Sequence, residues 1–280
     1  MVLHEPFFGN WYLEEKLGSG SFGTVYSIYR EDVDGTKLHA AMKVIQVPGS
    51  KVDVEEMKAQ GYSDKKIKAM YKPQLERLKN EIDVLDSFRG DDHIVIYEES
   101  KTVDMPNSPG WEIYIRMEKL ENLDKYLEKK KASMEDLLNL WIDMAKALKL
   151  VHKKGIIHRD IKPENILVSR EGMYKLADFG IARHLEQGST IMTRAGSYPY
   201  MAPEVNAHTE YDHRSDIYSL GIVMYRMFNH NRYPFLPDYP APFYPNDREE
   251  ALERRFSGEK IPCPKGIDKN IWAILEKCIA

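Results

Sequence analysis

The sequence predicts an α+β fold in two lobes: a small lobe with a five-stranded antiparallel sheet and one long helix, and a larger, mostly helical lobe. Three observations predict it. Short β-branched and aromatic runs separated by turn residues fill much of the first part. Long segments with apolar residues at helical spacing dominate the second part. A chain of 280 residues is long enough for two lobes, and the expected division is 1–117 and 118–280.

Composition narrows the class of protein. Hydrophobic residues make up 42% of the chain, enough for a core, and a formal net charge of −4 gives no general attraction to nucleic acid or to anionic membranes. Cys263 and Cys278 are the only cysteines, and they lack metal-ligand spacing. The first residues do not form a signal peptide, and no apolar run approaches a membrane span. We expect a cytoplasmic protein, with membrane anchoring through a longer parent chain left open.

Two short polar segments carry the chemistry. They read His158-Arg159-Asp160-Ile161-Lys162-Pro163-Glu164-Asn165 and Asp178-Phe179-Gly180. Phosphoryl transfer needs such groups together: an acceptor that orients a hydroxyl, a cation for the moving phosphoryl group, and oxygen ligands for Mg²⁺. The two segments resemble the catalytic loop and the metal-binding loop of eukaryotic-type (Hanks-type) serine/threonine protein kinases.

This resemblance covers nearly the whole chain and implies the bilobal protein-kinase fold. It implies that Asp160 orients the substrate hydroxyl and that Lys162 contacts the phosphoryl group. It also implies that Asn165 and Asp178 bind Mg²⁺. Lys162, two residues after Asp160, is the feature of the serine/threonine class.

A glycine-rich turn separates two predicted strands, 11–17 and 24–29, and its glycines are Gly18, Gly20 and Gly23. In a dinucleotide-binding fold a helix would have to follow, but β-branched and aromatic residues follow instead. We therefore expect a hairpin that covers ATP phosphates with its backbone N–H groups, as in the kinase family. A plain glycine hairpin is the alternative.

Lys43 lies among apolar residues in a third predicted strand, 38–47. Because burial of an unpaired ammonium group is costly, Lys43 needs a carboxylate and phosphate oxygens unless it faces outward. By resemblance its partner is Glu81, with Glu76 as the alternative.

Residues 52–88 have helical periodicity, and Pro73 is an expected start or break of the helix. The stretch 48–72 is longer than the usual connection in the family. Two interpretations stay open: a solvated extension of the helix, or a docking or regulatory element that sets the position of Glu81.

Predicted strands at 93–96 and 111–117 complete the sheet. The resemblance implies an adenine site at the end of the second of these strands, where the family uses the backbone. The implied nucleotide-binding residues outside the glycine turn are Val25, Ala41, Lys43, Met117, Glu118 and Leu120.

The second lobe opens with a predicted helix at 123–130, and another begins after Ser133 as N-cap. The expected buried face of this second helix consists of Leu137, Leu138, Trp141, Ala145, Leu148 and Val151. A buried helix is expected at 215–228, followed by an irregular loop to residue 246. By resemblance Asp216 holds the catalytic-loop backbone; the alternative is an exposed carboxylate at a helix N-terminus.

The implied function is transfer of the γ-phosphoryl group of Mg-ATP to serine or threonine hydroxyls of a protein substrate. Residues 178–204 resemble the activation segment, and the candidate autophosphorylation sites are Ser189, Thr190 and Thr193. A phosphate there could pair with Arg159. The alternatives are a pseudokinase-like nucleotide-binding scaffold, which would lack one of the catalytic groups, and a small-molecule kinase, which would lack Lys162.

The last ten residues resemble the penultimate helix of the family's large lobe. Family members continue to an arginine that pairs with the glutamate equivalent to Glu204. We therefore expect a truncated chain in which Glu204 binds water or takes Arg214 or Arg254 as its donor.

Overall fold

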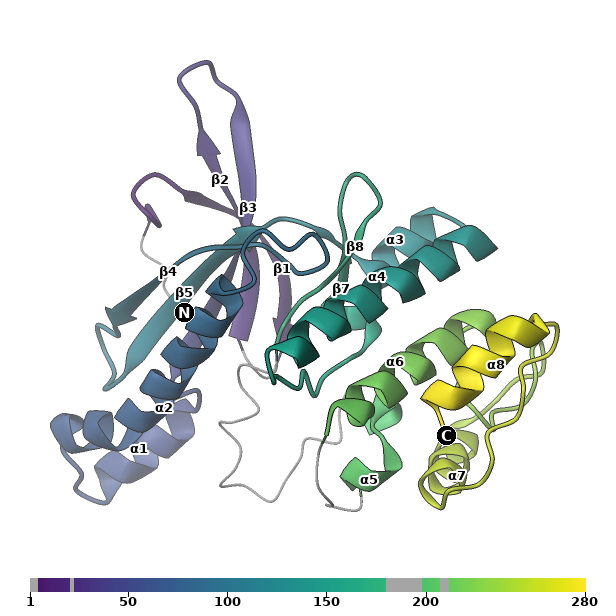
Figure 1. Cartoon of the computed structure of the whole chain (residues 1–280). Helices are drawn as coiled ribbons and strands as arrows, with labels where there is room; N and C mark the ends of the chain where they lie inside the picture. Colours follow the sequence, from purple (N-terminus) through teal and green to yellow (C-terminus); the bar gives the residue numbers. More distant parts are fainter. Residues whose placement is uncertain (1–4, 21–22, 180–197, 207–211) are drawn as a thin grey trace. The chain divides into compact units, whose positions relative to one another are not determined.

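The computed structural model describes residues 5–20, 23–179, 198–206 and 212–280 (Figure 1). The chain divides into two compact units. The first contains the chain up to Asp91 together with Val95–Leu120. The second contains Asp92–Ile94 and the chain from Glu121 onward as far as it is described. The first unit therefore ends at Leu120, beyond the expected boundary after residue 117.

The first unit is built on a five-stranded antiparallel sheet, as predicted. Its strands are β1 (Tyr12–Gly20), β2 (Gly23–Glu31), β3 (Lys37–Val47), β4 (Tyr97–Asp104) and β5 (Trp111–Glu118). Their order in the sheet is β1-β2-β3-β5-β4. The glycine-rich turn thus joins two neighbouring strands and opens no helix, which excludes the dinucleotide-binding alternative.

The predicted strand at 93–96 is wrong. Ile94 makes only an isolated parallel bridge to Leu176, and the Leu176 N–H donates to the His93 carbonyl at 2.9 Å, so His93 and Ile94 belong to the second unit. The strand that pairs with β5 begins at Tyr97 and is rich in charged residues. Because β4 is an edge strand, charged side chains are tolerated there.

One face of the sheet is covered by the N-terminal segment of the chain. This face packs under the N-terminal segment, in a cluster of Phe7, Trp11, Ile28, Ala40, Met42, Val44 and Tyr114. Arg116 of β5 lies 4.5 Å from the centre of the Trp11 ring and forms an ion pair with Glu98 at 2.6 Å. The N-terminal segment is therefore an integral part of the first unit.

Two helices follow β3: α1 (Lys51–Ala59) and α2 (Asp64–Asp86). Pro73 lies inside α2, so the prediction that it starts or breaks the helix is wrong. The break lies before Ser63, whose side chain caps α2. A proline inside a helix costs about 3 kcal/mol, and burial of α2 on both sides of Pro73, beginning with Ile67, offsets that cost.

The stretch 48–72 is therefore divided between two helices. Its second part is the first turns of α2, which agrees with an extension of that helix. Its first part forms a separate helix, α1, in which Val54 is buried. Both parts contribute side chains to the core, so the stretch is not simply solvated.

The second unit is mostly helical, and its elements run from a short strand to the last helix. They are β6 (Glu121–Asn122), α3 (Leu123–Lys129), α4 (Met134–Lys153), η1 (Pro163–Asn165), β7 (Ile166–Val168), β8 (Tyr174–Leu176), η3 (Tyr198–Tyr200), α5 (Pro203–Asn206), α6 (His213–Phe228), α7 (Pro245–Phe256) and α8 (Lys269–Cys278). Strands β6, β7 and β8 form a small sheet, and α4 packs against both β8 and α6.

Helix α4 begins as predicted, because Ser133 and Asp136 form a reciprocal capping box. Its buried face is shifted from the expected one: Ala145 is exposed and Ala147 is buried. The buried residues are Leu140, Trp141, Met144, Ala147, Leu148 and Val151. These positions form one face of the helix, and at about 100° per residue Ala145 lies further round the helix, beyond the edge of that face.

Helix α6 is almost continuously buried, as its apolar sequence predicts. Gly221 allows α8 to approach it closely, since a Cβ at this position would lie 2.5 Å from Ile279 Cγ2 and 3.0 Å from Cys278 Cβ. The chain from Asn229 to Tyr244 is irregular, also as predicted. Within the described ranges, none of the helices has the length and apolarity needed to cross a membrane.

Candidate functional site

The catalytic-loop residues lie in the second unit, between α4 and β7. Asp160 and Asn165 are both buried. Antiparallel pairing of β7 with β8 returns the chain to this loop, and the Ala177 N–H donates to the Asn165 carbonyl at 2.9 Å. Asp178 follows directly, so the hairpin brings together the two segments that the sequence separates.

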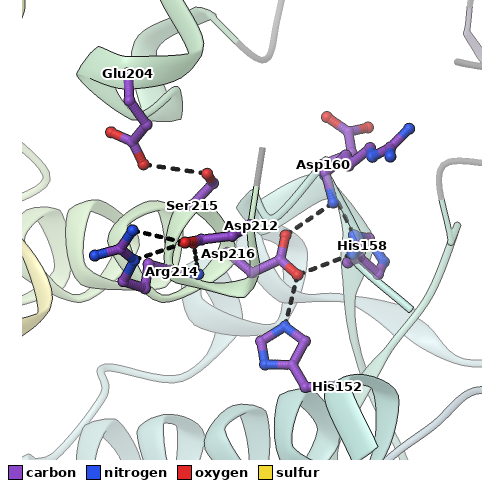
Figure 2. A network of polar contacts seen from close by, with 9 residues as sticks. His152, His158, Asp160, Glu204, Asp212, Arg214, Ser215 and Asp216 are labelled. Atoms are coloured by element: carbon purple, nitrogen blue, oxygen red, sulfur yellow. Dashed lines mark hydrogen bonds and ion pairs between the residues drawn. The ribbon is translucent and has the colours of Figure 1, made fainter. Parts of the chain in front are cut away.

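Asp216 of α6 holds the backbone of the loop (Figure 2). Its carboxylate accepts hydrogen bonds from the backbone N–H groups of His158 and Arg159, each at 2.8 Å. A third bond, also 2.8 Å, joins it to His152 Nε2 of α4. Asp216 is only 1% exposed, so the alternative of an exposed helix-terminal carboxylate is wrong.

The hydrogen bonds of His158 assign its tautomer. Its Nδ1 accepts from the Asp160 N–H at 3.3 Å, which leaves Nε2 as the protonated nitrogen that donates to the Ala177 carbonyl at 2.9 Å. Burial is the largest influence on this ring and lowers its pKa, so the imidazole is neutral. His158 therefore links the two polar segments as a structural group.

Asp160, Lys162 and Asn165 form one polar cluster. Lys162 Nζ lies 3.0 Å from Asp160 Oδ2. The Asn165 side-chain NH₂ donates to the Asp160 carbonyl at 2.7 Å and to its Oδ2 at 2.9 Å. The sequence predicted these three residues, and the structure brings them together.

The amide of Asn165 is oriented suitably for a metal ligand. Because its NH₂ group makes both hydrogen bonds to Asp160, its carbonyl oxygen remains available as an acceptor. With the Asp178 carboxylate this gives two oxygen donors, the kind of set that Mg²⁺ uses together with substrate phosphates. The residues present therefore fit the metal.

Four nucleotide-site candidates in the strands of the first unit share one face of its sheet. Val25 pairs with Lys43 and Lys43 with Ile115, while Ala41 pairs with Met117. Directly paired residues, and residues two apart on a strand, point to the same face. Val25, Ala41, Lys43 and Met117 therefore lie together, on the side opposite the cluster under the N-terminal segment.

The three glycines of the turn differ in the space that a side chain would have at each position. A Cβ on Gly23 would lie 2.3 Å from the Val44 carbonyl oxygen, and its φ of +132° favours glycine. A Cβ on Gly18 or Gly20 would meet nothing within 4 Å. Packing explains Gly23, whereas Gly18 and Gly20 leave open space beside the backbone. Residues 21–22 lie outside the described part of the chain.

Glu81 and Glu76 occupy different sides of α2. Glu76 is exposed and lies 3.9 Å from Lys79, one turn along the same helix. Glu81 is half-buried, between the buried residues Leu78 and Ile82. Lys43 is itself buried, at 5% exposure. Of the two candidate partners, Glu81 is the one on the buried side of the helix.

The segment 118–120, at the end of β5, is fixed within the first unit by its side chains. The Glu118 N–H donates to the Ile96 carbonyl at 3.1 Å, and the Glu118 side chain accepts from the Ile96 N–H at 2.7 Å. Lys119 Nζ lies 3.2 Å from the Glu14 carboxylate of β1. These contacts position the chain that leads to Leu120.

Some supporting residues were not predicted. The sequence did contain a signal that could have identified His152, because this polar residue comes four positions after Leu148 on the buried face of α4. Glu14 and Ser27 are hydrogen-bonded across β1 and β2. Ser27 is fully buried in a strand of apolar neighbours, but the partner of such a serine cannot be identified from sequence.

The activation segment, 178–204, lies partly outside the described residues, which include none of Ser189, Thr190 and Thr193. At Glu204 the Ser215 hydroxyl donates at 3.1 Å (Figure 2). This donor was not predicted. Arg254, one of the expected donors, pairs instead with Glu259 at 2.5 Å. Arg214 pairs with Asp212 at 2.7 Å.

Comparison with known proteins agrees with this geometry. The family profile described as protein kinase domain matches residues 11–280. Serine/threonine-protein kinase STY46 of Arabidopsis thaliana is 31% identical over 266 residues, covering 94% of this chain and 39% of that protein. Serine/threonine-protein kinase ULK3 of Xenopus laevis is 29% identical over 268 residues, covering 92% of this chain and 48% of that protein.

A probable serine/threonine-protein kinase of Clostridium perfringens, CPE1738, is 40% identical over 163 residues, covering 56% of this chain. This chain covers 22% of the length of that protein. It therefore spans less than half the length of each of these three relatives. The family profile, in contrast, extends over nearly all of this chain. The chain therefore belongs to the protein kinase domain family, as its motifs predicted.

Proposed function

We propose that this protein is a serine/threonine protein kinase that transfers the γ-phosphoryl group of Mg-ATP to hydroxyl groups of a protein substrate. The observation that carries the proposal is the cluster of Asp160, Lys162 and Asn165, in a loop whose backbone is held by the buried carboxylate of Asp216. Membership of the kinase family supports the same reaction.

In the proposed mechanism the residues of the catalytic loop act on the hydroxyl and on the phosphoryl group. Asp160 accepts a hydrogen bond from the substrate hydroxyl and orients its oxygen. The proton passes from that oxygen to the Asp160 carboxylate as the new phosphorus–oxygen bond forms and the bond to ADP, the leaving group, breaks. Lys162 places its positive charge near the oxygens of the moving phosphoryl group, which stabilises the charge of the transition state.

Asn165 and Asp178 hold Mg²⁺, which neutralises phosphate charge when it is bound. The first unit contributes the remaining nucleotide contacts. Lys43 binds phosphate oxygens and is oriented by Glu81. The residues proposed to surround the nucleotide are Gly18, Gly20, Gly23, Val25, Ala41, Met117, Glu118 and Leu120. The open space beside Gly18 and Gly20 supports close approach of phosphates to their backbone.

Two finer points belong to the same proposal. We infer autophosphorylation at Ser189, Thr190 or Thr193, with Arg159 as a partner for the phosphate. Intact-mass analysis followed by peptide mapping after incubation with ATP tests this. We also infer a reducing, cytoplasmic compartment, which the two unpaired cysteine thiols support.

The decisive experiment is incubation of the protein with labelled Mg-ATP and separate serine-, threonine- and tyrosine-containing peptides. We expect label on the serine and threonine peptides, and its loss in Lys43→Met with the fold intact. If the wild-type protein binds an ATP analogue but labels no peptide, the pseudokinase-like scaffold is the correct interpretation. If a tyrosine peptide is labelled in preference, the assigned class is wrong.

A further inference from the structure

Arg226 lies near the end of α6, and its guanidinium group contacts two tyrosine rings. Its central carbon is 4.7 Å from the centre of the Tyr233 ring and 5.5 Å from that of Tyr200. It donates one hydrogen bond to the Tyr200 hydroxyl and another to Asn231 Oδ1. These contacts hold a half-buried cation in one orientation.

The charge of Arg226 has no carboxylate partner among the described residues. Both of its hydrogen-bond partners are neutral, and its Nε is buried without an acceptor in that part of the chain. Arg214, on the same helix, pairs with Asp212 at 2.7 Å. A guanidinium group has five N–H donors in a planar fork that matches a carboxylate. Arg226 is thus prepared to bind an acidic group from another molecule.

The surface beside Arg226 is preorganised by a second arginine. Arg255 of α7 is 2% exposed and donates to the carbonyls of Pro199 and of Met201, the latter at 3.2 Å. Tyr200, between these two residues, is 3% exposed. The chain from Tyr198 to Met201 is therefore held by α6 through the side chain of Tyr200 and by α7 through its carbonyls. A binding group held in this way loses little conformational entropy on association.

Arg226 is also within reach of a substrate bound at the catalytic loop. Asp216, which holds that loop, lies on the same helix, and a rise of 1.5 Å per residue places the two positions roughly 15 Å apart along the axis. An extended peptide covers this distance in about five residues, at roughly 3.3 Å each. Burial raises the pKa of Tyr233, and the negative charge of Glu164 in the catalytic loop adds to that rise.

We propose that Arg226 is a specificity-determining residue that selects protein substrates with an acidic side chain within about five residues of the acceptor hydroxyl. The inference rests on the proposed kinase function and deepens it by naming the substrate class.

The test uses one serine peptide in which each of the five positions on either side of the acceptor carries aspartate, alanine or lysine in turn. For the wild-type protein we expect kcat/KM to be about tenfold higher with aspartate than with lysine at one or two of these positions, as one charge-assisted hydrogen bond provides. Arg226→Glu should invert this preference, and Arg226→Gln should abolish it. Arg214→Glu, the same charge reversal on the same helix, should leave it unchanged.

Thermal unfolding of each variant shows whether its fold is retained. Glutamine is chosen at position 226 because its amide can still donate to Tyr200. Equal kcat/KM of the wild-type protein for all the peptides would overturn this inference but not the proposed function. So would an Arg226→Gln variant that lowers kcat/KM equally for every peptide, because Arg226 would then only position Tyr200. If the wild-type protein phosphorylates no peptide, the proposed function fails and takes the inference with it.

Discussion

The catalytic loop and the glycine-rich hairpin are both short polar segments, but the fold positions them in different ways. The catalytic loop is held by residues that are distant in the chain: the Asp216 carboxylate accepts from the backbone of His158 and Arg159. The hairpin is held by its own strands, and Gly20 pairs directly with Gly23. The catalytic loop therefore depends on tertiary contacts, whereas the hairpin depends on local strand pairing.

The difference corresponds to what each segment is proposed to do. A group that orients a reacting hydroxyl must be placed to within a fraction of an ångström, so its loop is fixed by a buried carboxylate with three donors. A segment that covers phosphates needs backbone N–H groups and space, which strand pairing and small residues provide. Four predictions test this contrast, in order of the size of the expected effect.

Asp160→Asn should have the largest effect. It keeps the shape of the side chain but removes the negative charge that faces Lys162, and we expect kcat to fall by roughly 10³-fold. Steady-state kinetics with a serine peptide measures this. The matched control is Asp136→Asn, another aspartate paired with a lysine of the second unit, at 2.8 Å from Lys130, which should retain activity. Similar kcat values for the two variants would contradict the assignment of Asp160.

Asp216→Ala should have the next largest effect. It leaves two backbone N–H groups of the loop buried without an acceptor, and we expect the free energy of unfolding to fall by about 2–5 kcal/mol. Urea denaturation measures the loss, and hydrogen exchange at residues 156–160 should show reduced protection. Asp216→Asn, which retains one acceptor oxygen, should lose less. Unchanged protection in Asp216→Ala would show that the loop does not depend on α6.

Gly23→Ala and Gly20→Ala compare two glycines of the hairpin. Gly23→Ala places a Cβ against the Val44 carbonyl at a positive φ, and should cost about 2–3 kcal/mol of stability. Gly20→Ala has open space, so its stability should change by less than about 1 kcal/mol while KM for ATP rises. Thermal unfolding and ATP titration separate the two effects. An equal loss of stability would refute the distinction between them.

Glu14→Gln should have the smallest effect. The hydrogen bond from Ser27, assisted by Lys119 and His39, lowers the pKa of Glu14 from 4.5 to about 2. Because the folded pKa is depressed, the stabilisation is complete above the unfolded pKa of 4.5 and is lost as the pH falls toward 2. Glu14 is partly exposed, so we expect no more than about 1 kcal/mol. The stability difference between the wild-type protein and Glu14→Gln should therefore shrink between pH 4.5 and 2; a constant difference would contradict it.

Much of the fold was predictable because its signals are local. The β-branched residues after Gly23 predicted a hairpin, the Ser133 cap predicted the start of α4, and the apolar run after Asp216 predicted a buried helix. The failures share a cause. The apolar stretch around Ile94 is buried outside the five-stranded sheet, and Pro73 is tolerated because α2 is packed on both sides of it. Sequence patterns indicate that a residue is buried, but not which element it packs against.

By itself the sequence determined the chemistry available to this protein: the order and types of Asp160, Lys162, Asn165 and Asp178 predicted phosphoryl transfer, and glycine and β-branched residues predicted the strands. Only the tertiary structure decided how those groups are held. His152 and Asp216 meet across 64 residues, and the structure places Glu81, not Glu76, on the buried side of α2. Covalent order encodes residue types and local geometry, whereas hydrogen bonds between distant elements form only when the chain has packed.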